Sequence, residues 1–349
     1  MASRASCLAA AAVMAACAAI SLPALAQTPA EFFAGKTVTL ICSADAGGAV
    51  DLNARHVAKY LARYIPGSPS VVVRNMPGAG HLVGTNFLYN QAPRDGTTIG
   101  TVINAMPLHQ VTGGQGTRFD AAKFNWLGST GVSNLTIMVW HQAGVKSIED
   151  VKRKEVVLGA TGVSSGTYVY AYGLNQLLGT RFRMVTGYKG ITDIDLAIER
   201  GEVQGRSGAS LSGVIKEHAE WLKSGKLFPL VQIGIARDKL YPDVPLYHEL
   251  EATDEQRQIL KLLASPVLIG RPYLAPPDTP VDRVAALRKA FWDTMQDQKF
   301  LAEAESFALE INPLDAAGLI KVIEETMRTP PELLAKAKPI LQPGEAPKK

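Results

Sequence analysis

The stretch that decides the fold runs Thr37-Val38-Thr39-Leu40-Ile41-Cys42-Ser43-Ala44-Asp45-Ala46-Gly47-Gly48-Ala49-Val50-Asp51. Its first six residues predict an interior strand, and the two glycines predict a turn. A helix follows, because apolar residues recur at the i, i+3, i+4, i+7 spacing of one buried face: Ala54, Val57, Ala58 and Leu61. A strand that leads directly into an amphipathic helix is half of a βαβ unit, so we expect an α/β fold with a mainly parallel sheet.

The same strand-to-helix pattern occurs again in the middle of the chain. Val156-Val157-Leu158 predicts a strand, and a helix is predicted from about Ser165 to Leu178, where Gly179 can end it. Further strands are predicted at Val71–Val73, Thr98–Ile103, Val203 and Leu227–Ile235, and the last hundred residues are mostly helical, with a frayed Pro/Lys-rich tail. The chain therefore holds two similar α/β modules.

The amino terminus predicts export. Arg4 precedes an apolar stretch from Cys7 to about Ile20, and Ala24-Leu25-Ala26 forms a small-x-small cleavage site before Gln27. The stretch is shorter than the roughly 20 residues that span a bilayer. We therefore expect residues 1–26 to be a cleaved signal peptide and the protein to be periplasmic, although a retained anchor and lipidation at Cys17 are the alternatives.

The mature chain of about 323 residues is longer than one core usually supports, so two domains are expected. Cleavage removes Cys7 and Cys17 and leaves Cys42 without a disulfide partner, which suits a buried strand thiol. The formal net charge is only +4 before cleavage, and this small value argues against nucleic acid as a partner.

Signals for enzyme chemistry are weak. No two of the six histidines lie three or four residues apart, so a local zinc motif is absent. Gly78-Ala79-Gly80-His81-Leu82-Val83-Gly84 imitates a dinucleotide-binding loop, but it begins several residues after its strand and behind Pro77. We expect no cofactor, no metal and no enzymatic activity, while a triad assembled from distant residues stays open.

The two glycine-rich turns are the candidate ligand sites. Ala46, Gly47 and Gly48 precede one helix, where close backbone approach and free N–H groups favour an anion; a plain tight turn with Asp51 as cap is the alternative. Thr161, Gly162 and Ser165 precede the other helix and add hydroxyl donors, unless the serine is simply an N-cap. Together these turns predict that one carboxylate is gripped from both sides.

Three further loops carry polar candidates. Tyr188 is expected on the loop after a strand, Arg206 lies among small residues after the predicted strand at Val203, and Asn104 follows the strand that ends at Ile103. The guanidinium of Arg206 can pair bidentately with a second carboxylate, although a surface arginine is an equal alternative.

These motifs, in this order, resemble the receptor family of tripartite tricarboxylate transporters, also called the Bug family. The resemblance spans nearly the whole mature chain and is carried by Leu40–Arg55, Asn75-x-Pro77-Gly78-Ala79-Gly80, Pro93-x-Asp95-Gly96-Thr97, Leu158–Thr167, Tyr188-Lys189-Gly190, Pro242-Asp243-Val244-Pro245 and Ala275-Pro276-x-x-Thr279-Pro280. It implies a two-domain periplasmic-binding-protein fold of type II, a Venus flytrap with a ligand cleft between the domains. We expect residues 27–131 and 238–349 to form domain 1 and residues 132–237 to form domain 2.

The resemblance also implies a site and partners. In the family, the loop after the first strand and the Ser/Gly loop of the second domain hold a ligand carboxylate; these correspond here to Ala46, Gly47 and Gly48 and to Thr161, Gly162 and Ser165. Asn104, Tyr188 and Arg206 are expected at the far end of the ligand. The implied partners are a small organic acid and the membrane permease subunits, and a sensory module or an exported enzyme is the alternative.

The chain departs from the family in one loop. Ser43-Ala44-Asp45-Ala46 stands where a Pro-rich stretch usually precedes the two glycines, and the carboxylate of Asp45 can repel a dicarboxylate or attract an amine.

Overall fold

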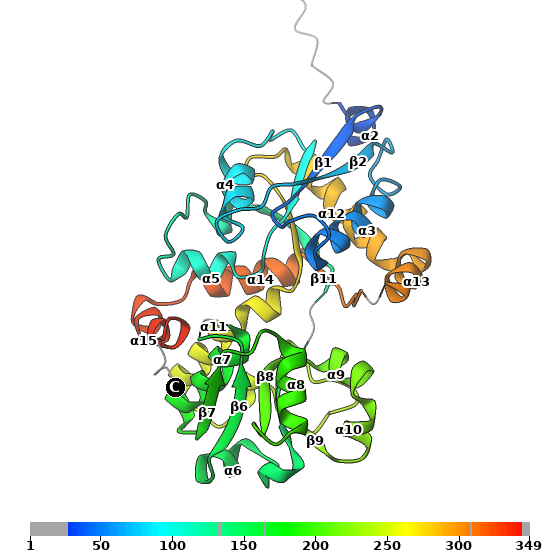
Figure 1. Ribbon diagram of the computed structural model, residues 1–349. Coiled ribbons are helices and arrows are strands. Elements are labelled where there is room, and N and C mark those ends of the chain that lie inside the picture. Colours follow the sequence, from blue (N-terminus) through cyan, green and yellow to red (C-terminus); the bar gives the residue numbers. More distant parts are fainter. Residues whose placement is uncertain (1–26, 132–133, 164, 308, 344–349) are drawn as a thin grey trace, which may run out of the picture.

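The computed structural model describes residues 27–131, 134–163, 165–307 and 309–343. The predicted signal peptide lies outside the described residues. Two sheets, each covered by helices, form two lobes stacked one above the other (Figure 1). The structure thus confirms the α/β prediction, with one sheet in each lobe.

The first sheet has six strands in the order β11-β4-β10-β3-β1-β2. Strand β1 pairs in parallel with β2 and β3, while β10 is antiparallel to β3 and β4. The strands are β1 (Thr37–Cys42), β2 (Ser70–Asn75), β3 (Thr98–Thr101), β4 (Asn125–Ser129), β10 (Pro272–Ala275) and β11 (Leu314–Asp315).

The second sheet has five strands in the order β7-β6-β8-β5-β9. Strands β7 and β8 pair in parallel with β6, and β5 is antiparallel to β8 and β9. The strands are β5 (Leu135–Trp140), β6 (Val156–Ala160), β7 (Phe182–Thr186), β8 (Gly205–Ser210) and β9 (Leu227–Ile233).

Helices cover both faces of each sheet, as an α/β fold requires. The α-helices are α2 (Pro29–Phe33), α3 (Ala49–Leu61), α4 (Leu82–Asn90), α5 (Met106–Val111), α6 (Ile148–Arg153), α7 (Gly166–Leu178), α8 (Ile191–Glu199), α9 (Leu211–Glu217), α10 (Ala219–Lys223), α11 (Asp254–Ile269), α12 (Val281–Gln296), α13 (Gln298–Ser306), α14 (Ala316–Met327) and α15 (Pro331–Leu341). In the described part of the chain, none of these helices is long and apolar enough to cross a membrane.

The helix after β1 forms as the apolar spacing predicts. Ala54, Val57 and Leu61 are fully buried on one face of α3, and Ala58 is nearly so. They pack in a core with β1 and with helices of the carboxyl-terminal part of the chain, such as α12. Cys42 is a free, fully buried thiol in this core, as predicted from its strand flanks.

The carboxyl ends of the parallel strands in both lobes border the segment that links the lobes. Strand β4 runs parallel to β3, since both are antiparallel to β10, so its end at Ser129 lies at the same edge as the ends of β1 and β3. In the second sheet Leu135, the first residue of β5, pairs with Ser210, the last residue of β8. Ser212 then donates a 2.7 Å hydrogen bond to the Glu310 carboxylate of the first lobe. Loops at these two edges therefore lie next to the lobe junction.

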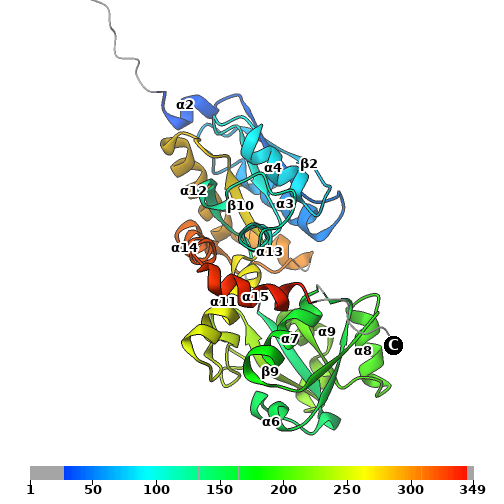
Figure 2. The ribbon, with the colours of Figure 1, turned by 90° about the vertical axis from the view of Figure 1, so that its left-hand side faces the viewer.

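The carboxyl-terminal segment packs against both sheets. Helices α12 and α14 contribute to the cores of the first sheet, whereas α11 and α15 share a core with β5, β6 and β9 of the second. Figure 2 shows α14, α11 and α15 stacked where the lobes meet. The predicted boundaries at residues 131 and 238 stay a prediction.

Three sequence expectations differ from the structure. Arg206 lies inside strand β8, not on a loop after a strand at Val203, because this Gly/Ser-rich segment is held between β5 and β6. The strand predicted to run to Ile103 ends at Thr101. Residues 331–341 of the tail form the helix α15, whose Leu333, Ala337 and Ile340 are buried.

Candidate functional site

The first candidate loop joins β1 to α3 and is exposed at Ala46, Gly47 and Gly48. Gly47 has a φ of +84°, which favours glycine, and Gly48 is the N-cap of α3 without a side-chain capping bond. The N–H groups of the first helical turn have no intrahelical acceptors, and the helix dipole adds partial positive charge. This loop offers an exposed backbone surface suited to an anion.

Asp51 holds this loop in place from beneath. Its carboxylate is 1% exposed, accepts a 2.8 Å hydrogen bond from the Gly47 N–H, and pairs with Arg55 Nε at 2.9 Å. Asn75 donates to Asp51 Oδ1 at 2.8 Å and to the Ala44 carbonyl at 3.0 Å. Burial alone raises the pKa of Asp51, but the bonds from Arg55, Gly47 and Asn75 outweigh it and leave the pKa below its usual value. Asp51 therefore organises the loop as an anion and does not face a ligand.

The next loop of the first lobe carries backbone strain. Four consecutive residues from Gly78 to His81 have positive φ, including the non-glycine residues Ala79 (46°) and His81 (74°). His81 Nδ1 lies 3.0 Å from the hydroxyl of buried Ser43, which ties this loop to the first one. Asn104, in the turn before α5, is half-buried, and within the described residues its amide has no hydrogen-bond partner.

The second candidate loop joins β6 to α7 and contains a cluster of hydroxyl groups. Ser165 is the N-cap of α7, but its Oγ donates to the Gly162 carbonyl at 2.7 Å and makes no bond to the helix amides. Thr167 Oγ1 lies 2.5 Å from Ser165 Oγ and 3.1 Å from Thr161 Oγ1, and it accepts from the Thr161 N–H at 3.0 Å. The first-turn amides of α7 are thus left uncapped by Ser165, next to three hydroxyls.

Tyr188 lies on the loop from β7 to α8, on the α8 face of the sheet. Its ring is half-buried, and a Cβ placed on Gly159 would come within 3.3 Å of it. Burial, followed by the negative charge of Glu202, raises the pKa of Tyr188, so its hydroxyl stays protonated and can donate a hydrogen bond at neutral pH.

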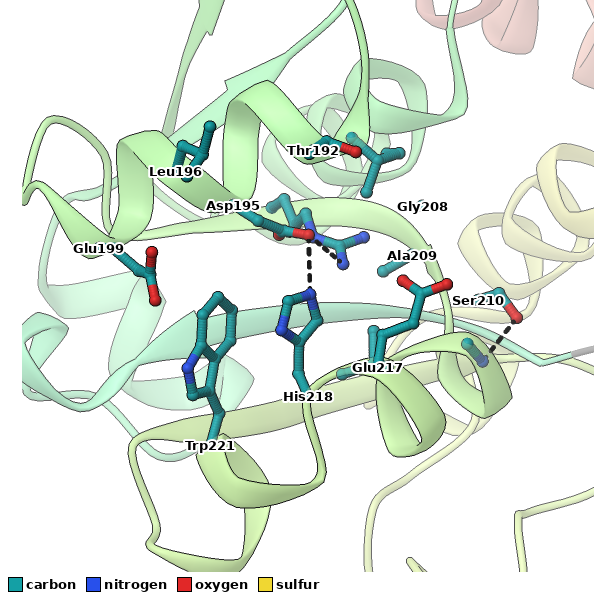
Figure 3. A pocket seen from close by; sticks show the side chains of 14 residues that line it. Thr192, Asp195, Leu196, Glu199, Gly208, Ala209, Ser210, Glu217, His218 and Trp221 are labelled. Carbon is teal, nitrogen blue, oxygen red and sulfur yellow. Dashed lines mark hydrogen bonds and ion pairs between the residues drawn. The ribbon is translucent and has the colours of Figure 1, made fainter.

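Arg206 is buried and already has a carboxylate partner. Its side chain is 3% exposed, and its Nε and Nη2 lie 2.6 and 3.2 Å from the two carboxylate oxygens of Asp195 on α8. His218 Nε2 lies 3.1 Å from the same carboxylate, and its ring stacks on Trp221 with centroids 3.9 Å apart (Figure 3). The alternative of a surface arginine is therefore wrong.

These groups form one wall of a cavity of about 630 Å³ between α8 and α9/α10. The exposed carboxylates of Glu199 and Glu217 also line it, so its surface carries excess negative charge. A second ligand carboxylate would have to compete with Asp195 for Arg206 and approach these two acids. The role of Arg206 in ligand binding stays a prediction.

The structure groups the predicted residues by lobe. Ala46, Gly47, Gly48 and Asn104 follow strands of the first sheet, and Thr161, Gly162, Ser165 and Tyr188 follow strands of the second, all at the carboxyl edges that border the lobe junction. Sequence reasoning missed Thr167 as the hub of the hydroxyl cluster, although it stood in the quoted motif. It also missed the Asp195–Arg206–His218 cluster, whose members are 11 and 12 residues apart on separate elements.

No group of three or more His, Cys, Asp or Glu side chains suited to hold a metal ion occurs among the residues that the structure describes.

Known proteins share this architecture. A crystal structure of a TctC solute binding protein from Polaromonas, without ligand, is 18% identical and has a TM-score of 0.70, with 88% of this chain and 98% of that chain covered. The periplasmic binding protein BugD is 20% identical at a TM-score of 0.54 (87% and 97% covered), and MatC from Rhodopseudomonas palustris, solved with bound malate, is 18% identical at 0.52 (88% and 99% covered). At such identities these likenesses support the two-domain periplasmic-binding-protein fold.

The sequence itself gives the family. A comparison with curated proteins finds no match. The family model described as "Tripartite tricarboxylate transporter family receptor" matches residues 53–338, which is most of the chain. The chain therefore belongs to the receptor family of tripartite tricarboxylate transporters.

Proposed function

We propose that this protein is a periplasmic receptor that binds a small organic acid between its two lobes and delivers the acid to the permease of a tripartite tricarboxylate-type transporter. One observation carries the proposal beyond the family: each lobe presents a glycine-rich strand-to-helix loop at the edge that borders the lobe junction. Two helix N-termini that converge on one region provide the arrangement of N–H groups that a carboxylate requires.

The second lobe adds donors to its helix N-terminus. Thr161, Ser165 and Thr167 place three hydroxyls beside the uncapped amides of α7, and a ligand carboxylate would replace the Gly162 carbonyl as the acceptor of the Ser165 hydroxyl. The first lobe adds Asn104, whose amide has no partner elsewhere in the described chain and is available to the distal part of a ligand. Tyr188 contributes a protonated hydroxyl from the second lobe, which can donate to the same distal part of the ligand.

Related proteins bind acids of this class. MatC from Rhodopseudomonas palustris was solved with malate, and another protein of that organism, 18% identical with a TM-score of 0.54, was solved with adipate. Both acids carry two carboxylates. The exposed Asp45 of the present chain lies in the first loop and disfavours a second negative charge close to it, so the distal carboxylate of a diacid would have to point away from this residue.

The same arrangement supports binding without chemical conversion. The binding groups proposed here are backbone amides, hydroxyls and an amide side chain, and among the described residues no His, Lys, Asp or Glu side chain is hydrogen-bonded to the Thr161, Ser165 or Thr167 hydroxyl to activate it as a nucleophile. Closure of the lobes around the acid then presents an occupied receptor to the permease. Cleavage of residues 1–26 would place the receptor in the periplasm.

A thermal-shift screen of the purified mature protein tests the proposal. Ligands that bind only the native state raise the melting temperature, and we expect a saturable rise with one class among mono-, di- and tricarboxylates, amino acids and aromatic acids. Ser165→Ala should weaken binding of that acid by about 0.5–1.5 kcal/mol, because one hydrogen-bonding hydroxyl is lost from the loop. Ser224→Ala, the same change at an exposed helix end of the second lobe, is the control.

A rise with no acid of the panel, or equal affinity of the Ser165→Ala and Ser224→Ala variants, would contradict the assignment of this loop. Loss of uptake of the identified acid in cells that lack the receptor distinguishes transport from sensing.

A further inference from the structure

A second cavity of about 620 Å³ lies at the lobe junction, between helices and away from the candidate loops. One face of α11 lines it with Gln258, Lys261, Leu262, Ser265 and Leu268, and one face of α14 with Gly318, Lys321, Val322, Glu325 and Thr326. Both sets follow helical spacing, so each helix turns a continuous stripe to the cavity. Figure 2 shows these two helices stacked with α15 between the lobes. The volume is in the range of about 300–1,000 Å³ that small-molecule sites occupy.

The cavity combines apolar walls with unpaired positive charge. Leu262, Leu268 and Val322 belong to its walls, and the ammonium groups of Lys261 and Lys321 have no ion-pair partner within the described residues. Arg328, also in the lining, pairs with the Glu324 carboxylate at 3.1 Å. Against the two free lysines stands one lining carboxylate, Glu325, which leaves a net charge of about +1 for a ligand to neutralise.

His248, which lines the same cavity, has a ring nitrogen without a hydrogen-bond partner. Its Nδ1 is buried and has no partner in the described part of the chain, although buried polar atoms are rarely left without one. Burial, followed by the positive charge of Lys261, lowers the pKa of His248, so the ring is neutral at pH 7. In the tautomer protonated at Nδ1, the ring has one N–H to donate to an anion.

We infer that this junction cavity binds a monocarboxylate with an apolar body, such as a medium-chain fatty acid or an aryl acid. The carboxylate neutralises Lys261 and Lys321, and a turn of the His248 ring toward the cavity would let its buried Nδ1 donate to the carboxylate, while the chain or ring covers the leucine and valine walls. The walls come from α14, which packs on the first sheet, and from α11, which packs on the second, so the ligand would bridge the lobes. This inference is independent of the function proposed for the loops.

Isothermal titration calorimetry with octanoate tests the inference on the full mature chain. We expect octanoate to bind the wild type saturably. The Lys261→Gln/Lys321→Gln variant should bind octanoate about fivefold to thirtyfold more weakly, because two partly exposed ion pairs with the carboxylate are lost. The control variant, Lys216→Gln/Lys226→Gln, removes the same charge from exposed sites of the second lobe and should bind like the wild type. Octanol, which lacks the carboxylate, should bind the wild type more weakly than octanoate.

Several outcomes would overturn the inference. These are no saturable binding of octanoate to the wild type, equal affinity of the Lys261→Gln/Lys321→Gln variant, and an equal loss in the Lys216→Gln/Lys226→Gln control. If Ser165→Ala weakens octanoate binding and the Lys261→Gln/Lys321→Gln change does not, the acid occupies the loop site and the junction cavity is not its site. Circular dichroism of both double variants establishes that they are folded, since the four lysines are exposed.

Discussion

Single buried charges set the geometry of the candidate site. Asp51 does not contact a ligand in this account, yet it fixes the Gly47 amide, the Arg55 guanidinium and the Asn75 amide around one carboxylate. An ionised carboxylate that accepts hydrogen bonds from three donors stabilises the folded state more than a neutral acceptor would, because charge-assisted hydrogen bonds are about twice as strong as neutral ones. The sequence predicted that Asp51 caps the helix, but Gly48 is the N-cap of α3 without a side-chain capping bond, and Asp51 instead accepts from the Gly47 N–H in the preceding loop.

Replacing Asp51 by Asn should lower the free energy of unfolding by about 1–3 kcal/mol, because the Arg55 and Gly47 donors lose their buried anionic acceptor. Urea denaturation at neutral pH measures the change. Asp45→Asn, at an exposed position of the loop that precedes α3, is the matched control, and its free energy of unfolding should stay within about 0.5 kcal/mol of the wild-type value.

The stabilisation by Asp51 should also depend on pH. Since its folded pKa is lowered, its contribution is present above the unfolded pKa and disappears as the pH falls through the folded pKa. We expect the difference in urea midpoint between wild type and Asp51→Asn to shrink from about pH 7 towards about pH 2. A difference that is constant over this range would show that the Asp51 charge does not stabilise the loop.

The buried Arg206–Asp195 pair gives a second prediction. Asp195→Ala should destabilise the protein by about 3–5 kcal/mol, because a buried guanidinium is left without its carboxylate. Asp195→Ala/Arg206→Met removes both charges and should recover most of that loss. Glu199→Ala is the control, because Glu199 is exposed and lies one turn further along the same helix; this change should leave the free energy of unfolding nearly unchanged. Chemical denaturation of the three variants measures these changes. Equal losses of stability in Asp195→Ala and Glu199→Ala would show that the buried pair does not stabilise the protein.

At the scale of elements, strand-to-helix junctions were the most predictable part of the chain. β1 with α3 and β6 with α7 were recognisable because a short apolar run, glycines and an amphipathic spacing follow one another in sequence. β8 was misplaced for the opposite reason: Gly205-Arg206-Ser207-Gly208-Ala209 has the composition of a loop. Its strand form depends on pairing with β5 and β6, which are remote in sequence, so tertiary context overrides local preference.

Gly47 and Gly162 have different backbone conformations in their loops, and substitution of each by alanine tests whether the difference affects stability. Gly47 has a φ of +84°, so Gly47→Ala should cost about 1–2 kcal/mol of stability although its Cβ would meet no atom within 4 Å. At Gly162 an added Cβ would also meet no atom within 4 Å, and φ is not positive. The free energy of unfolding of Gly162→Ala should therefore stay within about 0.5 kcal/mol of the wild-type value. Thermal unfolding of both variants measures the difference, and equal losses would show that backbone strain at Gly47 is not the cause.

At the scale of the whole molecule, the chain length predicted two domains and the family resemblance predicted a two-lobed receptor. The sequence did not reveal that α11 and α15 pack with the second sheet while α12 and α14 pack with the first. Apolar periodicity identifies which face of a helix is buried, but not which sheet buries it. The cavities beside α8 and between α11 and α14 were equally hidden, because their lining residues come from separate parts of the chain.

The central claim is that the two lobes hold one organic acid and release it unchanged. Isothermal titration calorimetry with the acid that raises the melting temperature most, followed by chemical analysis of the recovered acid, tests it most directly. We predict saturable binding that the Ser165→Ala change weakens, and complete recovery of the unaltered acid. The absence of saturable binding across the acid panel, or conversion of the acid into a product, would contradict the account.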